Sequence, residues 1–445
     1  MSILIGVLLI LLALLACMTW VFYLFRDKPH LIIILLFLFV GLNKVVSTQI
    51  GIPAVLIKYF GDILVVYLFT LAIMVRLRHG KKCFVAIPMT IFALLLLTTI
   101  ISFIANSGSI GAYLRCFVKI YRYFMFFFSC IIFLNRKDVE KIFSLLYGLF
   151  ILDVIMSSIQ YFVQGIKWDF NGGIFGIQVG GNAENNVFLS LMCIYALAMF
   201  FSNKISLVKA VSVLGGTVYV ATLSELKLLY IELVFIIALV VLCYKPSKKT
   251  IGIFVSFMIV IFIAIQIMGQ IYPIFKDFFS ISKMIEYASD DNYGGTGRAL
   301  NRLTSLPYVL ENFLNTPLQK LFGLGLGYAS EGTPFHNTYG FLCYDWFFDS
   351  YYVIENGLLG MALYIIFIIT NICTCVVRMV RNNDDRRYYI IGITSSVMIF
   401  VYSLYDNSMM NIIAYMLFYF YAIPYIIYKD KVYEVAKKKY ENSNN

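Results

Sequence analysis

Long uncharged apolar segments alternate with short polar connections along almost the whole chain. The stretches 2–25 and 83–105, for example, each run for more than twenty residues without a charge. A helix rising about 1.5 Å per residue needs roughly twenty apolar residues to cross the hydrocarbon core of a membrane. The pattern therefore predicts thirteen spanning helices, which we expect at residues 3–25, 31–48, 54–75, 84–105, 113–134, 142–163, 186–202, 206–222, 226–244, 250–271, 351–377, 388–405 and 410–428.

The connections divide the chain into four regions. Residues 1–271 carry the first ten spans, 272–350 form one large loop, 351–428 carry the last three spans and 429–445 form a basic tail. Long connections of this kind usually carry function. Because prolines, glycines and aromatic residues run through the whole loop, we expect an ordered and partly helical cap. The predicted fold class is thus an all-α polytopic membrane protein.

Composition supports this class and excludes others. Hydrophobic residues make up 61% of the chain and charged residues 13%, whereas soluble domains are nearer half apolar and a quarter charged. The formal charge of +11 is explained by topology and by contact with anionic lipid, so nucleic-acid binding is not expected. The nine cysteines are odd in number and mostly lie in apolar runs, so a disulfide framework is not expected.

Basic residues concentrate in alternate connections, and this fixes the predicted orientation. Of the 35 lysines and arginines, 23 lie in the connections near residues 26–28, 76–82, 136–141, 204–209, 245–249 and 378–387 and in the tail. Short basic loops stay in the cytoplasm. We therefore predict an outer N-terminus, a cytoplasmic C-terminus and a large loop on the outer face, which thirteen spans satisfy.

Histidine chemistry is confined to one position on that face. The chain has His30 and His79 in cytoplasmic connections, and His336 in the large loop. An imidazole exchanges protons near neutral pH, so His336 is a candidate general base, although a solvated loop histidine is the plainer alternative. Asn337 follows it, and the upstream run 321–327 (Leu-Phe-Gly-Leu-Gly-Leu-Gly) would let backbone approach a ligand at Gly325 and Gly327.

Cations inside the fifth span form a second constellation. Arg115, Lys119 and Arg122 are spaced i, i+4, i+7 and share one helical face. Arg122 lies well inside the hydrocarbon layer, where a charge is costly unless it is paired or faces a wet cavity. Asp153 in the sixth span is a candidate partner, in which case part of this stripe is structural.

Further cations lie on the predicted outer side. Lys227 opens the ninth span next to Glu225, and Arg298 and Arg302 are i, i+4 in what we expect to be a short helix of the loop. Guanidinium forks bind phosphate oxygens in pairs. Together with the stripe of the fifth span, these residues predict a site for a lipid-linked phosphate or pyrophosphate. Aromatic residues after His336, Tyr339 among them, could stack on sugars or belong to an interfacial belt.

In layout and in one region, the chain resembles the O-antigen polymerase and ligase superfamily, most closely the Wzy-type polymerases of surface polysaccharide. The region runs from Arg298 to Gly360 and holds the 321–327 run, the His336-Asn337 pair and the sequence Glu-Asn-Gly-Leu-Leu-Gly at 355–360. The resemblance implies a GT-C-like glycosyltransferase in the bacterial cytoplasmic (inner) membrane, acting on its outer face. The implied reaction is metal-independent, needs no cofactor and uses an undecaprenyl-pyrophosphate-linked glycan as donor.

The resemblance also assigns roles. His336 matches the catalytic histidine of the family's large loop, and Arg298 or Arg302 matches its upstream arginine. Relatives often carry Ser-Arg where this chain has Ser-Glu-Leu-Lys at 224–227, so Lys227 would replace an arginine with weaker bidentate binding. The predicted site is completed by the residues that would position substrate, namely Asn337, Tyr339, Gly325, Gly327 and Glu355.

The expected function is polymerisation of lipid-linked repeat units into O-antigen or capsular polysaccharide by inverting transfer. Donor and acceptor would both be undecaprenyl-pyrophosphate-linked glycans, with membrane lipid, a chain-length regulator and a flippase as partners. Two alternatives stay open. An O-antigen ligase would use the same residues with another acceptor, and a lipid-linked oligosaccharide flippase would move lipid without forming bonds. Transporters usually show paired halves, which this sequence lacks.

Overall fold

The computed structural model describes residues 28–47, 54–79, 85–106, 109–178, 181–244, 299–381 and 385–443, together with Phe25 and isolated positions between 252 and 289. Every regular element in these ranges is a helix. The predicted spans 3–25 and 250–271, apart from such isolated positions, lie outside the described residues. So does most of the first part of the large loop, residues 272–298.

The other predicted spans are helices. They are α2 (Pro29–Val45), α3 (Ala54–His79), α4 (Ala86–Asn106), α5 (Ile110–Phe133), α6 (Arg136–Ser158), α7 (Gly181–Phe201), α8 (Leu207–Leu223), α9 (Lys227–Cys243), α16 (Phe348–Arg381), α17 (Arg386–Tyr405) and α18 (Ala414–Ser443). Among the described helices, seven are long and apolar enough to cross a membrane. The protein is therefore an all-α membrane protein, whereas the number of thirteen spans stays a prediction.

Aromatic side chains join helix α5 to its neighbours on several sides. Phe124 and Phe127 both pack edge-on against Phe367 of α16, and Phe126 packs edge-on against Tyr415 of α18. Helices in lipid gain little from hydrophobic burial against one another and depend instead on close packing. Interlocking rings provide that packing here, and they hold α5 against α3, α16 and α18.

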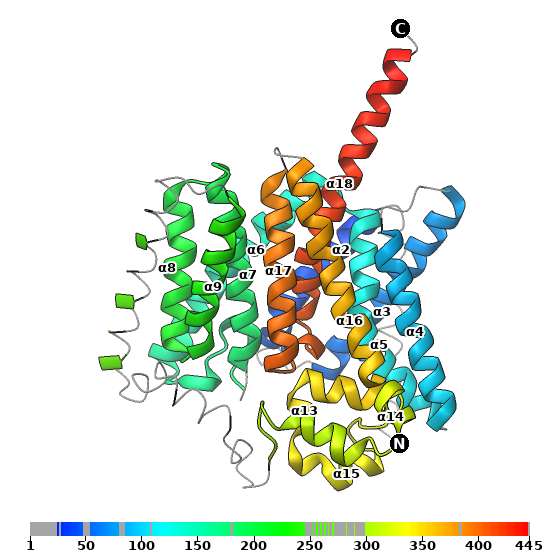
Figure 1. Ribbon diagram of the computed structural model, residues 1–445. Coiled ribbons are helices and arrows are strands. Elements are labelled where there is room, and N and C mark those ends of the chain that lie inside the picture. The colour runs from blue at the N-terminus through cyan, green and yellow to red at the C-terminus, as the bar shows by residue number, and fades with distance from the viewer. Residues whose placement is uncertain are drawn as a thin grey trace, which may run out of the picture.

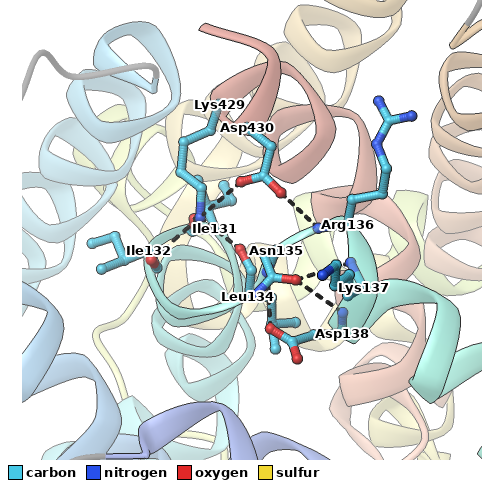
Figure 2. A network of polar contacts seen from close by, with 9 residues as sticks. All are labelled: Ile131, Ile132, Leu134, Asn135, Arg136, Lys137, Asp138, Lys429 and Asp430. Atoms are coloured by element: carbon cyan, nitrogen blue, oxygen red, sulfur yellow. Dashed lines mark hydrogen bonds and ion pairs between the residues drawn. The ribbon is translucent and has the colours of Figure 1, made fainter. Parts of the chain in front are cut away.

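A lysine of α18 caps the end of α5 (Figure 2). The Lys429 ammonium donates to the carbonyls of Ile131, Ile132 and Leu134 at 2.8, 3.3 and 2.6 Å. The last carbonyls of a helix have no intrahelical donor, and the helix dipole favours a cation there. Next to it, the Asp430 carboxylate accepts from the Arg136 backbone N–H at 2.6 Å, where α6 begins.

Other basic connections meet at this same face. The Arg136 guanidinium pairs with Asp385 at 2.6 Å, and Lys431 approaches the other oxygen of that carboxylate at 3.9 Å. Arg386 donates to the Cys243 carbonyl at 2.5 Å. The connections α5–α6 and α16–α17, the end of α9 and the last part of α18 therefore lie together. In Figure 1 α18 continues well beyond the bundle on this side.

A cap of short helices covers the opposite end of the bundle (Figure 1). It contains α13 (Ser305–Tyr308), the π-helical turn η5 (Val309–Phe313), α14 (Pro317–Phe322), α15 (Pro334–Tyr339) and the 3-10 turns η6 (Gly340–Leu342) and η7 (Tyr344–Trp346). For residues 299–347 the prediction of a partly helical cap is confirmed. The expected short helix around Arg302 is wrong, because this residue lies in a turn before α13; Arg298 is not among the described residues.

The cap on α5 predicts a difference between two lysines of α18. Replacing Lys429 by Met leaves three carbonyls without their charged donor, so we expect the free energy of unfolding to fall by about 2–3 kcal/mol. Lys437→Met removes only an exposed pair with Glu441 and should cost under about 0.5 kcal/mol. Melting temperatures of the two variants in one detergent test this, and equal values would contradict the capping role.

Candidate functional site

The glycine-rich loop of the cap, residues 323–333 between α14 and α15, packs against a break in α16. Gly357 has φ 68° inside this long helix, which prevents the usual helical bond to the Ile354 carbonyl. That carbonyl instead accepts from the Leu324 backbone N–H at 2.7 Å. A side chain at Gly357 would overlap the Leu321 carbonyl, so only glycine lets the loop approach α16 this closely.

Glu355 of α16 holds the same loop through hydrogen bonds. Its fully buried carboxylate accepts from the backbone N–H of Ala329 at 2.8 Å and from that of Gly327. A buried carboxylate is costly unless hydrogen bonds satisfy it, and here two backbone donors do so. The sequence predicted that Glu355 positions substrate. In the structure its carboxylate binds the loop that lines the cleft.

A cleft of about 260 Å³ lies between the cap and the ends of α4 and α5 that are nearest to it. Its floor is the glycine-rich loop, with Gly325 and Gly327, and its walls include Ala112 of α5 and Pro334 and Phe335 of α15. Most of the lining consists of apolar side chains and glycine backbone. Asn106, Ser109 and Thr333 contribute polar side chains. A mostly apolar cleft with a few polar groups is the usual form of a small-ligand site.

His336 lies one residue from the wall of this cleft. Thr333 caps α15 by accepting from the His336 backbone N–H at 3.2 Å, and Pro334 occupies the first turn, as helix starts favour. The imidazole is half-buried, and its Nδ1 lies 3.2 Å from the Tyr344 hydroxyl. That hydroxyl donates in turn to the Ala329 carbonyl at 2.8 Å. The predicted base is thus held by the loop that Glu355 fixes.

Aromatic rings surround this part of the cap. Phe335 packs against Phe313, Tyr339 and Tyr344, with ring centroids 5.0, 5.0 and 5.6 Å apart. Tyr339 is exposed at 37% and the Asn337 side chain is also exposed. Both predicted substrate-positioning residues therefore stand on the open side of α15.

Two of the three predicted α5 cations lie beneath the cap. Arg115 is exposed, and its Nε donates to the Gly111 carbonyl at 3.4 Å, next to the cleft residue Ala112. Lys119 is half-buried, with its Nζ 4.6 Å from the centroid of the Tyr351 ring. It also lies close enough to Glu355 to attract that carboxylate.

Arg122 is in a different environment. Its guanidinium is buried and pairs with Asp62 of α3 at 2.6 Å, and it donates to the Met410 carbonyl at 3.0 Å. Asp153, the partner considered from sequence, instead accepts from the Ile174 backbone N–H at 3.0 Å. The expectation of a pairing with Asp153 is wrong, because Asp62 occupies that role.

Of the remaining predicted cations, Lys227 and Arg302 are not among the residues that line the cleft. Lys227 pairs with Glu225 at 3.0 Å where α9 begins, and Figure 1 places α9 on the far side of the bundle from α14. Arg302 donates to the Tyr405 carbonyl at 3.3 Å and covers the ring of that residue. Burial raises the pKa of the neighbouring Asp406 to about 6, and the charge of Arg302 opposes this rise.

Sequence reasoning counted Tyr344 only among the aromatic residues after His336 and missed its contact with the imidazole, and it missed Ala329 and Asp62 altogether. Tyr344 follows Cys343, whose φ of 54° turns the chain back toward α15, and no sequence pattern announces that turn. Ala329 contributes only backbone groups. Asp62 lies in an otherwise apolar span, and this lone acidic residue was the one available signal.

The described residues contain no group of three or more His, Cys, Asp or Glu side chains that could hold a metal ion. Comparison of the chain with protein-family models and with curated proteins finds no match. The chemistry of the site is therefore inferred from its own residues.

Two glycines of the cap form a matched pair for testing how the loop is seated. Gly327 and Gly332 have φ of 87° and 82°, so alanine strains the backbone at both by roughly 1 kcal/mol. A Cβ at Gly327 would lie 2.4 Å from the backbone of Ala112, whereas nothing lies within 4 Å at Gly332. We expect Gly327→Ala to lower the free energy of unfolding by about 1–3 kcal/mol more than Gly332→Ala does, and therefore to unfold at a clearly lower temperature. Equal stability of the two variants would show that the loop is not seated as described.

The ion pair of Arg122 gives a second test. Asp62→Asn leaves a buried guanidinium without its countercharge and should cost about 3–5 kcal/mol. Replacing both residues, with Asp62→Leu and Arg122→Met, removes the charges together and should recover most of that loss. Thermal unfolding in detergent measures both. A stable Asp62→Asn variant would contradict the pairing.

Proposed function

We propose that this protein is a membrane glycosyltransferase that polymerises undecaprenyl-pyrophosphate-linked repeat units into surface polysaccharide. The observation that carries the proposal is a cleft at the cap end of the bundle that two elements with candidate chemistry line. His336 directly follows the lining residues Pro334 and Phe335 of α15, and the exposed Arg115 lies on α5, one turn after the lining residues Ser109 and Ala112. A lipid-linked substrate would present its phosphates at that border and its sugars to the cap.

In the proposed reaction the acceptor hydroxyl gives its proton to the free ring nitrogen of His336. The hydroxyl oxygen forms a bond to C1 of the donor sugar, while the bond from C1 to the pyrophosphate oxygen breaks. The electron pair of that bond stays on the pyrophosphate. Attack opposite the leaving group inverts the configuration at C1.

Arg115 is the best-placed residue to bind the pyrophosphate, because its guanidinium is open and lies on the helix that forms a wall of the cleft. Lys119 follows one turn deeper on the same helix and adds positive potential. Such preorganised cations stabilise a charge that develops on a leaving group. Arg122 and Arg302 are engaged with protein oxygens, so we give them no direct contact with substrate.

The cap would face outward from a bacterial cytoplasmic membrane. The lysine and arginine connections of α5–α6 and α16–α17 meet at the opposite end of the bundle, as the positive-inside rule requires of a cytoplasmic face. Exposed rings of the cap such as Tyr339 would then meet the sugars of the acceptor.

The proposal is tested with purified protein in liposomes that contain lipid-linked repeat units and EDTA. We expect a ladder of polymers from the wild type and a fall of roughly 100-fold or more for His336→Ala, the usual contribution of a general base. His30→Gln, a histidine change where α2 begins, is the control and should retain the ladder.

Other outcomes identify the rivals. Full activity of His336→Ala would remove the assigned base, and loss of activity in EDTA would overturn a charge-based reaction. Transfer only onto an added lipid A core acceptor would indicate a ligase. Movement of lipid across the liposome without growth of the glycan would indicate a transporter.

A further inference from the structure

His336 has two ring nitrogens, and only one can act as the base in the proposed function. In a neutral imidazole one nitrogen carries the proton and the other carries the free lone pair. Which is which depends on the partners of the ring. The structure supplies a partner for Nδ1, the Tyr344 hydroxyl at 3.2 Å.

The hydroxyl of Tyr344 has a single proton, and its geometry shows where that proton goes. It lies 2.8 Å from the Ala329 carbonyl, closer than to the imidazole. Ala329 is fully buried, and no other donor among the described residues reaches this carbonyl. An unsatisfied buried carbonyl costs about 1–3 kcal/mol, so the proton of Tyr344 belongs to Ala329. Burial also raises the pKa of Tyr344, which keeps the hydroxyl protonated at neutral pH.

Because the Tyr344 hydroxyl donates its proton to the hydrogen bond with the Ala329 carbonyl, its oxygen can only accept a hydrogen bond from the imidazole. We propose that Tyr344 is a positioning residue that keeps the His336 proton on Nδ1 and leaves Nε2 as the atom that removes the proton of the acceptor hydroxyl. This inference rests on the proposed function for the identity of the acceptor, while the tautomer itself follows from the contacts.

The surroundings of Nε2 agree with this assignment. A Cβ built on Gly340 would lie 3.0 Å from Nε2, so the absence of a side chain at this position keeps the nitrogen accessible. The backbone of Gly340 has φ −61° and ψ −25°, which any residue adopts. Glycine is therefore not needed for the chain path, and its value here is the open space beside the ring.

The anchor of Tyr344 is rigid. The Ala329 N–H donates to Glu355 of α16 at 2.8 Å, and the Ala329 carbonyl accepts from the Tyr344 hydroxyl. The ring of Tyr344 also packs against Phe313 and Phe335, with centroids 6.0 and 5.6 Å apart. The hydroxyl can therefore not follow the imidazole if the ring rotates, and it acts as a fixed reference for Nδ1.

The tautomer can be measured without any activity assay. The chain has three histidines, and replacing His30 and His79 by glutamine leaves His336 as the only one. With ¹⁵N-histidine labelling and NMR in lipid, we expect a protonated Nδ1 and an unprotonated Nε2 in the neutral ring. A proton on Nε2 would overturn the inference, even if the polymerase activity is confirmed.

Two variants connect the tautomer to turnover. Tyr344→Phe keeps the packed ring and removes the hydroxyl, so we expect kcat to fall roughly 10- to 100-fold, as for other partners that orient functional histidines. KM should change little, and the NMR spectrum should report a mixture of tautomers. Tyr308→Phe removes a hydroxyl from a ring that packs on Phe313 and should change neither quantity.

Gly340→Ala tests the other nitrogen. The alanine should leave the Nδ1 proton in place but crowd Nε2, so activity falls while the tautomer is unchanged. Wild-type turnover in Tyr344→Phe with an unchanged spectrum would overturn the positioning role. Inactivity of His336→Ala together with full activity of Tyr344→Phe would leave the proposed function standing and remove only this inference.

Discussion

The seating of the glycine-rich loop on α16 is the constraint on which the candidate site depends. Glu355 accepts two backbone N–H groups of the loop, and the break at Gly357 frees the Ile354 carbonyl for Leu324. These bonds join a cap segment to a membrane helix that runs the length of the bundle (Figure 1). Because these bonds are buried, the loop has one position relative to the bundle, and this position also fixes the cleft and the imidazole.

Helix α5 shows how one row of cations divides between structure and chemistry. Arg122 is closed off by Asp62 and the Met410 carbonyl, as a buried charge requires. Lys119 lies over the Tyr351 ring, and Arg115 stands open beside the cleft. The charges become more accessible toward the cap. Positive potential is therefore available at the phosphate site of the proposed function, while the charge deepest in the bundle is paired.

Hydropathy predicted the described helices well, because long apolar segments have few alternatives in a membrane. It did not predict where α6 begins, since the Asn135–Asp138 capping box starts this helix within a polar connection. Of the candidate site, the sequence singled out His336 and the glycines by their residue types and Glu355 by the family resemblance. It could not identify Asp62 or Tyr344 as partners, because both pairings join residues through tertiary contacts that no local spacing encodes. The Arg302 helix was wrong for a related reason: the Asn301 side chain accepts from the N–H groups of residues 303 and 304, which favours a turn.

The candidate site contains one group of residues fixed by buried contacts and another group that is exposed. The chain of contacts from Glu355 through Ala329 and Tyr344 to His336 is buried at three of its four members, so each fixes the next. The exposed residues of the cap, such as Tyr339 and Asn337, take no part in this chain. For the proposed reaction this separation has a chemical consequence. The proton acceptor stays in one place whatever sugar is bound, while the residues that would meet the sugar can change without disturbing it. In the proposed reaction these two properties therefore belong to different residues.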